Sequence, residues 1–195
     1  MARITLPPRD YSQSFNPVDS LARSILYQQL SGKAAATITG RVEALMLRRG
    51  YITGAGLDSA SDEDLRTAGV SRQKLAALRD LADKARVGVV PDHRKLARMD
   101  NQDIIDHLTQ VRGIGRWTVE MMLMSRLGRP DILPIDDLGI RKGAQIVCGL
   151  EELPKPRALA ELGQRWAPWR TRASFYLWRV VEVAQGDQPV RRSQA

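Results

Sequence analysis

The chain has 195 residues, of which 43% are hydrophobic and 27% charged, so it is long enough for one compact domain or two small lobes and is too apolar to be disordered. Thirty basic residues against 22 acidic ones give a formal net charge of +8, which favours a polyanionic partner such as nucleic acid. A single cysteine, Cys148, excludes an internal disulfide, and the absence of a membrane-length apolar run or a signal peptide leads us to expect a cytoplasmic protein with no membrane partner.

Helical periodicity and capping residues dominate the first half of the sequence. Asn16 followed by Pro17 is typical of an N-cap and a first helical residue. Ser31 is expected to cap a second helix, whose apolar face continues to Met46 and whose stop we place at Gly50. The same pattern predicts further helices that begin at Ser61, Ser71 and Asp100, and another that follows Gly115.

The second half continues in the same way after a short extended segment beyond Pro130. Helices are expected from about Leu138, from about Arg157, and from about Thr171 to Val183. No segment alternates with a period of two for long, so we predict an all-α fold of roughly eight to ten short helices. The polar segment 185–195 has nothing to pack, and we expect it to fray.

Two glycines one residue apart, Gly113 and Gly115, lie between two helical patterns. Their amides, at the start of the next helix, would point toward a phosphate oxygen, and Thr118 could add a hydroxyl group. An ordinary turn between helices, ended by a glycine, explains the two glycines equally well.

A pair of carboxylates, Asp136 and Asp137, precedes the helical pattern that starts near Leu138. An aspartate at this place is most often an N-cap, which stabilises a helix by about 0.5–2 kcal/mol. A carboxylate here could instead stabilise a developing cation or hold a water molecule, and two adjacent aspartates are more than one cap requires.

Other chemistries find no support in the sequence. His93 and His107 are far apart and have no cysteine or carboxylate at metal-ligand spacing around them, which argues against a zinc site. The chain also has neither a phosphate-binding GlyxxxxGlyLysSer/Thr loop nor a GlyxSerxGly nucleophile elbow.

Four segments, in this order, resemble the helix-hairpin-helix DNA glycosylases, and within them the alkylated-base branch of the 3-methyladenine DNA glycosylase II type. They are residues 25–35, 111–118, 134–143, and 165–170 followed by Tyr176 and Trp178. The resemblance covers about residues 15–183, and we expect the protein to lack the N-terminal β-rich domain that some members carry. It implies a two-lobed all-α fold: a helical barrel lobe at 17–129 with its hairpin at 111–115, and a second helical lobe at 130–195, together with 1–16, that carries the catalytic aspartate.

The resemblance implies a base excision repair enzyme that flips an alkylated purine out of DNA and hydrolyses its N-glycosidic bond, leaving an abasic site. The catalytic residue is then Asp137, with Asp136 in a capping or orienting role. A carboxylate beside the sugar would stabilise an oxocarbenium-like transition state. A purine alkylated at N3 or N7 is already cationic and a good leaving group, so no general acid is required.

The hairpin also predicts a monofunctional enzyme. Members that cut the DNA backbone place a lysine nucleophile two residues after the second glycine, and here that position is Trp117, whose indole cannot form an imine. Cys148 alone cannot supply the four-cysteine cluster loop of other relatives. The alternatives that stay open are a glycosylase for oxidised or deaminated bases and a non-catalytic helix-hairpin-helix DNA-binding module.

The resemblance also places the base pocket. Trp117 and Trp178 would stack on the flipped cationic base, and Gln28 would support the pocket. Met121 and Leu138 fall where relatives often carry tyrosines, so the pocket is expected to be less aromatic. Trp166 and Trp169 are interpreted as core residues, which is the plainer interpretation of any tryptophan in a chain with four.

Gln29 or Leu30 would be the wedge that fills the gap left by the flipped nucleotide, although polar residues at a helix end are often merely solvated. The family hairpin also binds Na⁺ or K⁺ through backbone carbonyls, here those of Thr109, Val111 and Ile114; no other cofactor is expected. The expected partner is double-stranded DNA with alkylated bases, bound by a monomer at the nucleoid.

Overall fold

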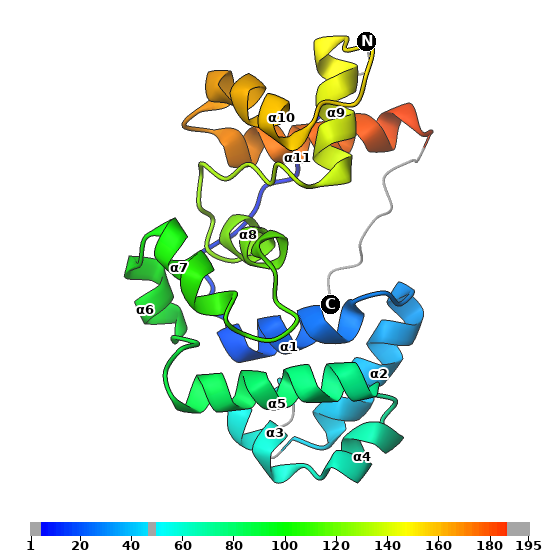
Figure 1. Ribbon diagram of the computed structural model, residues 1–195, viewed down its shortest axis with the longest axis vertical. Coiled ribbons are helices and arrows are strands. Elements are labelled where there is room, and N and C mark those ends of the chain that lie inside the picture. Colours follow the sequence, from blue (N-terminus) through cyan, green and yellow to red (C-terminus); the bar gives the residue numbers. More distant parts are fainter. Residues whose placement is uncertain (1–4, 47–49, 187–195) are drawn as a thin grey trace. The chain divides into compact units, whose positions relative to one another are not determined.

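A computed structural model describes residues 5–46 and 50–186, and over these ranges the chain forms eleven α-helices, one 3-10 helix and no strand (Figure 1). The predicted all-α class is confirmed. No described helix is both long and apolar enough to span a membrane. In chain order the helices are α1 (Pro17–Tyr27), α2 (Gly32–Ala44), α3 (Gly54–Ser59), α4 (Asp62–Thr67), α5 (Arg72–Arg86), α6 (His93–Arg98), α7 (Asn101–Leu108), α8 (Arg116–Ser125), α9 (Leu138–Cys148), α10 (Pro156–Leu162), the 3-10 helix η1 (Gly163–Trp166) and α11 (Arg170–Ala184).

Four of the predicted N-caps explain where their helices begin. The side-chain oxygen of Asn16 accepts the amides of Val18 at 2.9 Å and Asp19 at 3.3 Å, which satisfies two of the donors that a helix leaves unpaired at its start. Asp100 lies at the N-cap position of α7, but its side chain makes no capping hydrogen bond. Three other predicted caps accept the amide three residues later: Ser31, Ser61 and Ser71.

Two details of the helix prediction are wrong. The second helix ends at Ala44, where Leu45 caps it, rather than running on to a stop at Gly50. The six-residue helices α3 and α6 were not predicted, because fewer than two turns show little helical periodicity; their caps, Thr53 and Asp92, were the available signals. Most of the polar segment 185–195 lies outside the described residues.

The chain divides into two compact units, one made of residues 12–122 and the other of residues 1–11 with 123–195. The division falls within α8, earlier than the boundary predicted after residue 129. Hydrogen bonds explain the difference: the amide of Arg129 donates to the carbonyl of Leu123 at 2.9 Å, and the hydroxyl of Thr171 donates to the carbonyl of Arg129 at 2.6 Å. These hydrogen bonds connect residues 123–130 to α11.

The unit of residues 12–122 is organised around α5, which packs against α1, α3 and α4 (Figure 1). Apolar side chains at helical spacing form its core. The fully buried ones include Leu21, Ile25, Leu26, Leu57, Leu65, Leu78 and Leu81.

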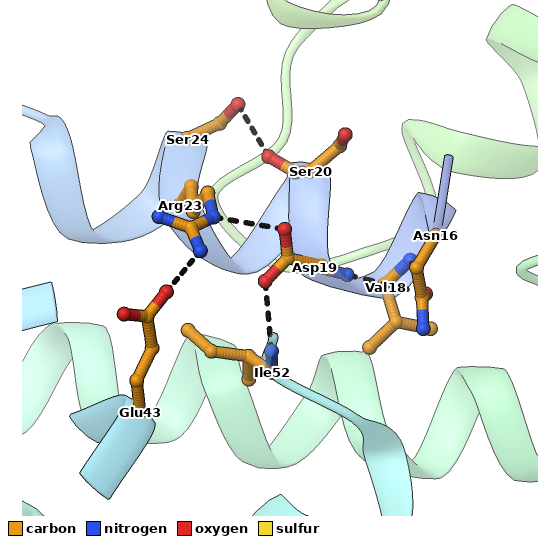
Figure 2. Close-up of polar contacts among 8 residues, drawn as sticks. All are labelled: Asn16, Val18, Asp19, Ser20, Arg23, Ser24, Glu43 and Ile52. Carbon is orange, nitrogen blue, oxygen red and sulfur yellow. Dashed lines mark hydrogen bonds and ion pairs between the residues drawn. The ribbon is translucent and has the colours of Figure 1, made fainter. Parts of the chain in front are cut away.

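A polar cluster joins three segments of this unit (Figure 2). Asp19 of α1 accepts the amide of Ile52 at 2.7 Å and the Nε of Arg23 at 2.8 Å, and Arg23 also pairs with Glu43 of α2. Burial would lower the pKa of Arg23, but the hydrogen bonds and charges of Asp19 and Glu43 outweigh it, so the pKa lies above its usual value. The cluster fixes α1, α2 and the chain before α3 to one another.

The other unit is built on α9, α10 and α11 (Figure 1). Its core consists of Ile140, Ala144, Leu159 and Leu177. Gly143 allows α9 and α11 to approach closely, because a Cβ there would lie 2.3 Å from the carbonyl oxygen of Leu177.

Candidate functional site

The loop that leads to Asp137 is attached to the start of α11. The hydroxyl of Thr171, which is 6% exposed, accepts the amide of Ile132 at 3.0 Å while it donates to the carbonyl of Arg129. Arg170 pairs bidentately with Asp131, with both nitrogen–oxygen distances 2.6 Å. The hydrogen bond from Arg170 holds the pKa of Asp131 below its usual value. These contacts fix the chain shortly before the aspartate pair.

Asp137 itself is the N-cap of α9. Its Oδ1 atom accepts the amide of Ile140 at 2.8 Å and the indole N–H of Trp178 at 2.8 Å. Of the two roles predicted for Asp136, capping or orienting, capping is wrong: Asp136 is exposed, and its neighbour Asp137 accepts the capping hydrogen bond. The capping and catalytic interpretations of the pair therefore fall on the same carboxylate and do not exclude each other. We call Asp137, with Ile140 and Trp178, the aspartate site.

Trp178 lies between the core and Asp137. It packs against the core of α9, α10 and α11 and tilts at 49° to the ring of Phe175, 5.7 Å away. Its indole N–H points to the carboxylate, so the structure gives it the role of orienting Asp137; its predicted stacking on a flipped base stays a prediction. Leu138, the other predicted pocket residue of this unit, follows Asp137 and is 51% exposed.

Two glycines that the sequence interpretation missed make this geometry feasible. A Cβ at Gly139 would lie 2.8 Å from a ring carbon of Trp178 and 3.1 Å from the Oδ1 atom of Asp137. Gly139 and Gly143 lie one helical turn apart and face α11, where larger side chains would push the indole away. The GlyxxxGly spacing in LeuGlyIleArgLysGly was the available signal.

The predicted hairpin connects α7 and α8 in the other unit. Gly113 has φ of +81°, a conformation that favours glycine, whereas Gly115 has open space around the position of a Cβ. Within the described part of the chain, neither glycine amide donates to another protein group. Thr118 is half-buried in the first turn of α8, where its amide donates to the carbonyl of Gly115 at 3.0 Å. The two glycine amides are available to an anion.

Contacts from α1 and α5 hold this hairpin in place. The carboxylate of Asp80 accepts the amide of Arg112 at 2.7 Å, and the side chain of Gln28 donates to the carbonyl of Gly113 at 2.8 Å. Ala77 lies against Gly113, with its Cβ 3.6 Å from the position of a Cβ there. Gln28, predicted to support the base pocket, therefore supports the hairpin. We call Gly113 and Gly115, with Asp80 and Gln28, the hairpin site.

Lys84 and Arg112 favour the charged form of Asp80. Burial alone would raise the pKa of this carboxyl group, but hydrogen bonds from Lys84 and from the amide of Arg112, with the charges of Lys84 and Arg112, together lower it. The Nζ of Lys84 lies 2.8 Å from the Oδ1 atom of Asp80. The amide of Arg112 is thus held by a carboxylate at neutral pH.

The remaining predicted residues of this unit lie on its surface. Gln29 and Leu30 follow the end of α1 and are exposed, and Gln29 has φ of +55°, which is rare for a residue with a side chain. Trp117, in the first turn of α8, is 49% exposed, and Met121 lies half-buried one turn later. Their wedge and pocket roles stay predictions.

The three carbonyls predicted to hold a monovalent cation belong to the same turn. The carbonyl of Val111 accepts the amide of Ile114 at 3.0 Å, which uses one of its two lone pairs. Backbone carbonyls are oxygen ligands of the kind that hard cations prefer, so Thr109, Val111 and Ile114 are compatible with such an ion. Among the residues described, no three His, Cys, Asp or Glu side chains gather into a further metal site.

Comparisons with known proteins address the whole chain. DNA-3-methyladenine glycosylase 1 of Schizosaccharomyces pombe is 34% identical over 184 residues, which cover 94% of this chain and 81% of that protein. A crystal structure of DNA-3-methyladenine glycosidase from Bacillus halodurans has a TM-score of 0.81 and 38% identity, covering 93% of this chain and 81% of that one. The structure of 3-methyladenine DNA glycosylase from S. pombe, in complex with abasic DNA, has a TM-score of 0.77 and 32% identity, covering 93% and 88% of the two chains.

Residues 22–168 also match the family model of the HhH-GPD superfamily base excision DNA repair proteins. This range contains the hairpin and the aspartate pair, which were two of the four segments that carried the resemblance in the sequence. The resemblance is confirmed, and the chain belongs to the HhH-GPD superfamily of base excision DNA repair proteins.

Proposed function

We propose that this protein is a monofunctional DNA glycosylase that binds double-stranded DNA and hydrolyses the N-glycosidic bond of alkylated purines, of the 3-methyladenine and 7-methylguanine type. The observation that carries the proposal is the carboxylate of Asp137, held by the amide of Ile140 and the indole of Trp178. Relatives named as 3-methyladenine glycosylases, similar over more than nine-tenths of this chain, support the substrate class.

The aspartate site suits a reaction in which positive charge develops on a sugar. A carboxylate beside C1′ stabilises the oxocarbenium-like transition state and can orient the attacking water. Both hydrogen bonds to Oδ1 are made within the unit of residues 123–195, so the carboxylate is oriented before substrate arrives. The water adds to C1′, its proton passes to solvent or to Asp137, and the base leaves with the electrons of the broken C–N bond.

Trp117 supports both the lack of lyase activity and the preference for cationic bases. An indole cannot form the Schiff base that backbone cleavage requires. A half-exposed indole can stack on a cationic purine and gain about 0.5–2 kcal/mol from cation–π attraction. Met121, one turn after Trp117 on α8, would add an apolar surface beside that indole, and Leu138 would present one next to Asp137.

DNA is held through its backbone in this proposal. The amides of Gly113 and Gly115 bind one phosphate, with help from the hydroxyl of Thr118, and the net charge of +8 adds attraction that does not depend on sequence. Gln29 or Leu30 fills the gap left by the flipped nucleotide. A Na⁺ or K⁺ ion at the carbonyls of Thr109, Val111 and Ile114 would add positive charge near that phosphate. The enzyme acts as a monomer at the nucleoid.

The test is base release from duplex DNA that carries 7-methylguanine or 3-methyladenine, scored with and without alkali. We expect free base and an intact backbone, which breaks only on alkali treatment. Borohydride should trap no covalent protein–DNA adduct. Strand breaks without alkali, or faster release of 8-oxoguanine than of 3-methyladenine, would favour an enzyme for oxidised bases; binding without any base release would favour a non-catalytic module.

A further inference from the structure

The turn after α1 has an unusual backbone. Gln29 is the one residue other than glycine with a positive φ in the described ranges, at +55°. A left-handed conformation is unfavourable for a residue with a side chain, so it persists only where neighbouring contacts hold it. Gln28, Gln29 and Leu30, which we call the 28–30 turn, are all exposed, so burial of their own side chains does not hold it.

Lys74 of α5 supplies the missing contacts. Its Nζ atom donates to the carbonyl of Leu26 at 2.7 Å and to the carbonyl of Gln28 at 2.9 Å. These carbonyls belong to the end of α1, where no backbone amide of the helix is available to pair with them. Burial lowers the pKa of Lys74, as expected for an ammonium group partly withdrawn from water. The lysine thus bridges the last turn of α1 and the residue just before Gln29.

The same face of α5 contacts the hairpin. Lys74, Ala77 and Asp80 are spaced by three residues, which places them along one side of the helix. Lys74 holds the 28–30 turn, Ala77 lies against Gly113, and Asp80 holds the amide of Arg112. The side chain of Gln28 closes the arrangement, because it donates from the 28–30 turn to the carbonyl of Gly113.

We propose that Lys74 is a positioning residue for base flipping: it fixes the 28–30 turn at a set distance from the phosphate-binding hairpin, so that the side chain entering the DNA does so in register with the bound phosphate. This inference rests on the proposed function. It predicts that Lys74 matters where a lesion must be pulled out of a base pair and matters little where the lesion is already unpaired.

The test compares Lys74→Met, which keeps the apolar stem and removes the donors, on two duplexes. One has 7-methylguanine opposite cytosine and the other has it opposite a tetrahydrofuran abasic analogue, where no partner base resists flipping. Under single-turnover conditions we expect about a tenfold or larger loss of rate on the paired lesion and less than about a threefold loss on the unpaired one. Lys74→Arg, which can still donate, should recover part of the loss.

Lys95→Met is the matched control, since it removes one positive charge from an exposed residue of α6. It should lower the rate of base release only slightly, and by the same factor on both duplexes. Thermal unfolding checks that Lys74→Met is folded, and Lys74→Gln replaces it in the same comparison if it is not. Equal losses on the two duplexes for a folded variant, or no loss on the paired lesion, would overturn the proposal.

A second measurement separates this proposal from the proposed activity. A duplex with 2-aminopurine beside a 7-methylguanine–cytosine pair reports base flipping and insertion of a side chain through the probe's fluorescence, without any base release. If the parent protein releases no alkylated base, the proposed function fails, yet Lys74 is still tested by this duplex. We expect the parent and Lys95→Met to change the fluorescence and Lys74→Met to change it less at saturating protein; an equal change would refute the positioning role.

Discussion

The aspartate site and the hairpin site are held in place by different kinds of interaction. Asp137 depends on buried or close-packed groups: the hydroxyl of Thr171 at 6% exposure, and a helix contact at Gly143 that leaves no room for a methyl group. The hairpin site depends on polar side chains near the surface, namely the carboxylate of Asp80 and the exposed amide of Gln28.

The contrast fits the role that we propose for each site. A carboxylate that stabilises a transition state loses effect when it moves by about an ångström, so close packing around it is useful. A phosphate grip must leave its donors accessible, and it therefore lies among solvated groups whose interactions salt and pH can weaken. We expect substitutions at the aspartate site to change catalysis or global stability, and those at the hairpin site to change binding.

The largest effect is expected for Asp137→Asn. The amide oxygen of asparagine can still accept the hydrogen bonds from Ile140 and Trp178, so the fold should be kept while the negative charge is lost. Base release should fall by about 10³-fold or more, because stabilising a cationic transition state is worth several kcal/mol. Single-turnover rates measure the loss of base release, and duplex affinity shows separately whether DNA binding is kept. Asp136→Asn, at the exposed neighbour, is the control; similar losses for both variants would contradict the assignment.

Gly143→Ala tests the close packing of α9 and α11. The new methyl group would overlap the backbone of Leu177, so the helices must separate, at a cost of about 1–3 kcal/mol in the free energy of unfolding. Gly40→Ala is the matched control, since Gly40 also lies inside a helix but has nothing within 4 Å. It should instead stabilise by up to about 1 kcal/mol. Urea unfolding of both variants gives the comparison, and a neutral Gly143→Ala would mean that the contact is loose.

Trp178→Phe removes one hydrogen bond from the carboxylate of Asp137 and keeps most of the ring. We expect kcat to fall about tenfold, the equivalent of a hydrogen bond to a charged group, with little change in duplex affinity. Trp166→Phe is the control, because Trp166 packs against the same core without a bond to Asp137. If both variants lose the same activity, the loss reflects packing and not the orientation of Asp137.

Gly115→Ala is expected to weaken DNA binding without affecting stability. The methyl group would meet no protein atom within 4 Å but would stand where a phosphate approaches the amides. Affinity for damaged and undamaged duplexes should fall alike, by about two- to tenfold for one hydrogen bond, since a phosphate carries no base information. Fluorescence anisotropy at two salt concentrations measures the affinity for each duplex. A loss confined to damaged duplexes would place Gly115 in the base pocket instead.

The smallest effect is a pH dependence at Asp80. Its pKa is lowered in the folded state, so its contact with Arg112 and Lys84 stabilises the protein above the ordinary aspartate pKa of about 3.9. That contribution is lost as the pH falls through the lower, folded-state pKa. In urea unfolding, the free energy of unfolding of the parent should exceed that of Asp80→Asn by up to about 1 kcal/mol at pH 7. This difference should shrink toward pH 3. A gap that does not change with pH would rule out a role for the charge.

Local signals made much of the fold predictable. Serine and asparagine caps marked the starts of helices because capping involves residues only two or three apart. The same locality limited the prediction at the aspartate pair: the sequence offered a cap or a catalytic group, and it gave no sign that Trp178, 41 residues away, donates a hydrogen bond to Asp137. Lys74 and Asp80 looked like ordinary charged residues on an amphipathic helix, because their partners, Gln28 and Arg112, are distant in sequence.

The discontinuous unit has a consequence for synthesis on the ribosome. Residues 12–122 emerge as one uninterrupted stretch, so the hairpin and its supports from α1 and α5 can assemble as soon as α8 leaves the exit tunnel. Residues 9–11 belong to the other unit, where Arg9 lies over the ring of Phe175 at 3.8 Å, and they must wait for α11. The hydrogen bond from the indole of Trp178 to Asp137 can form only at that same late stage. A nascent chain would thus form the hairpin site before the aspartate site.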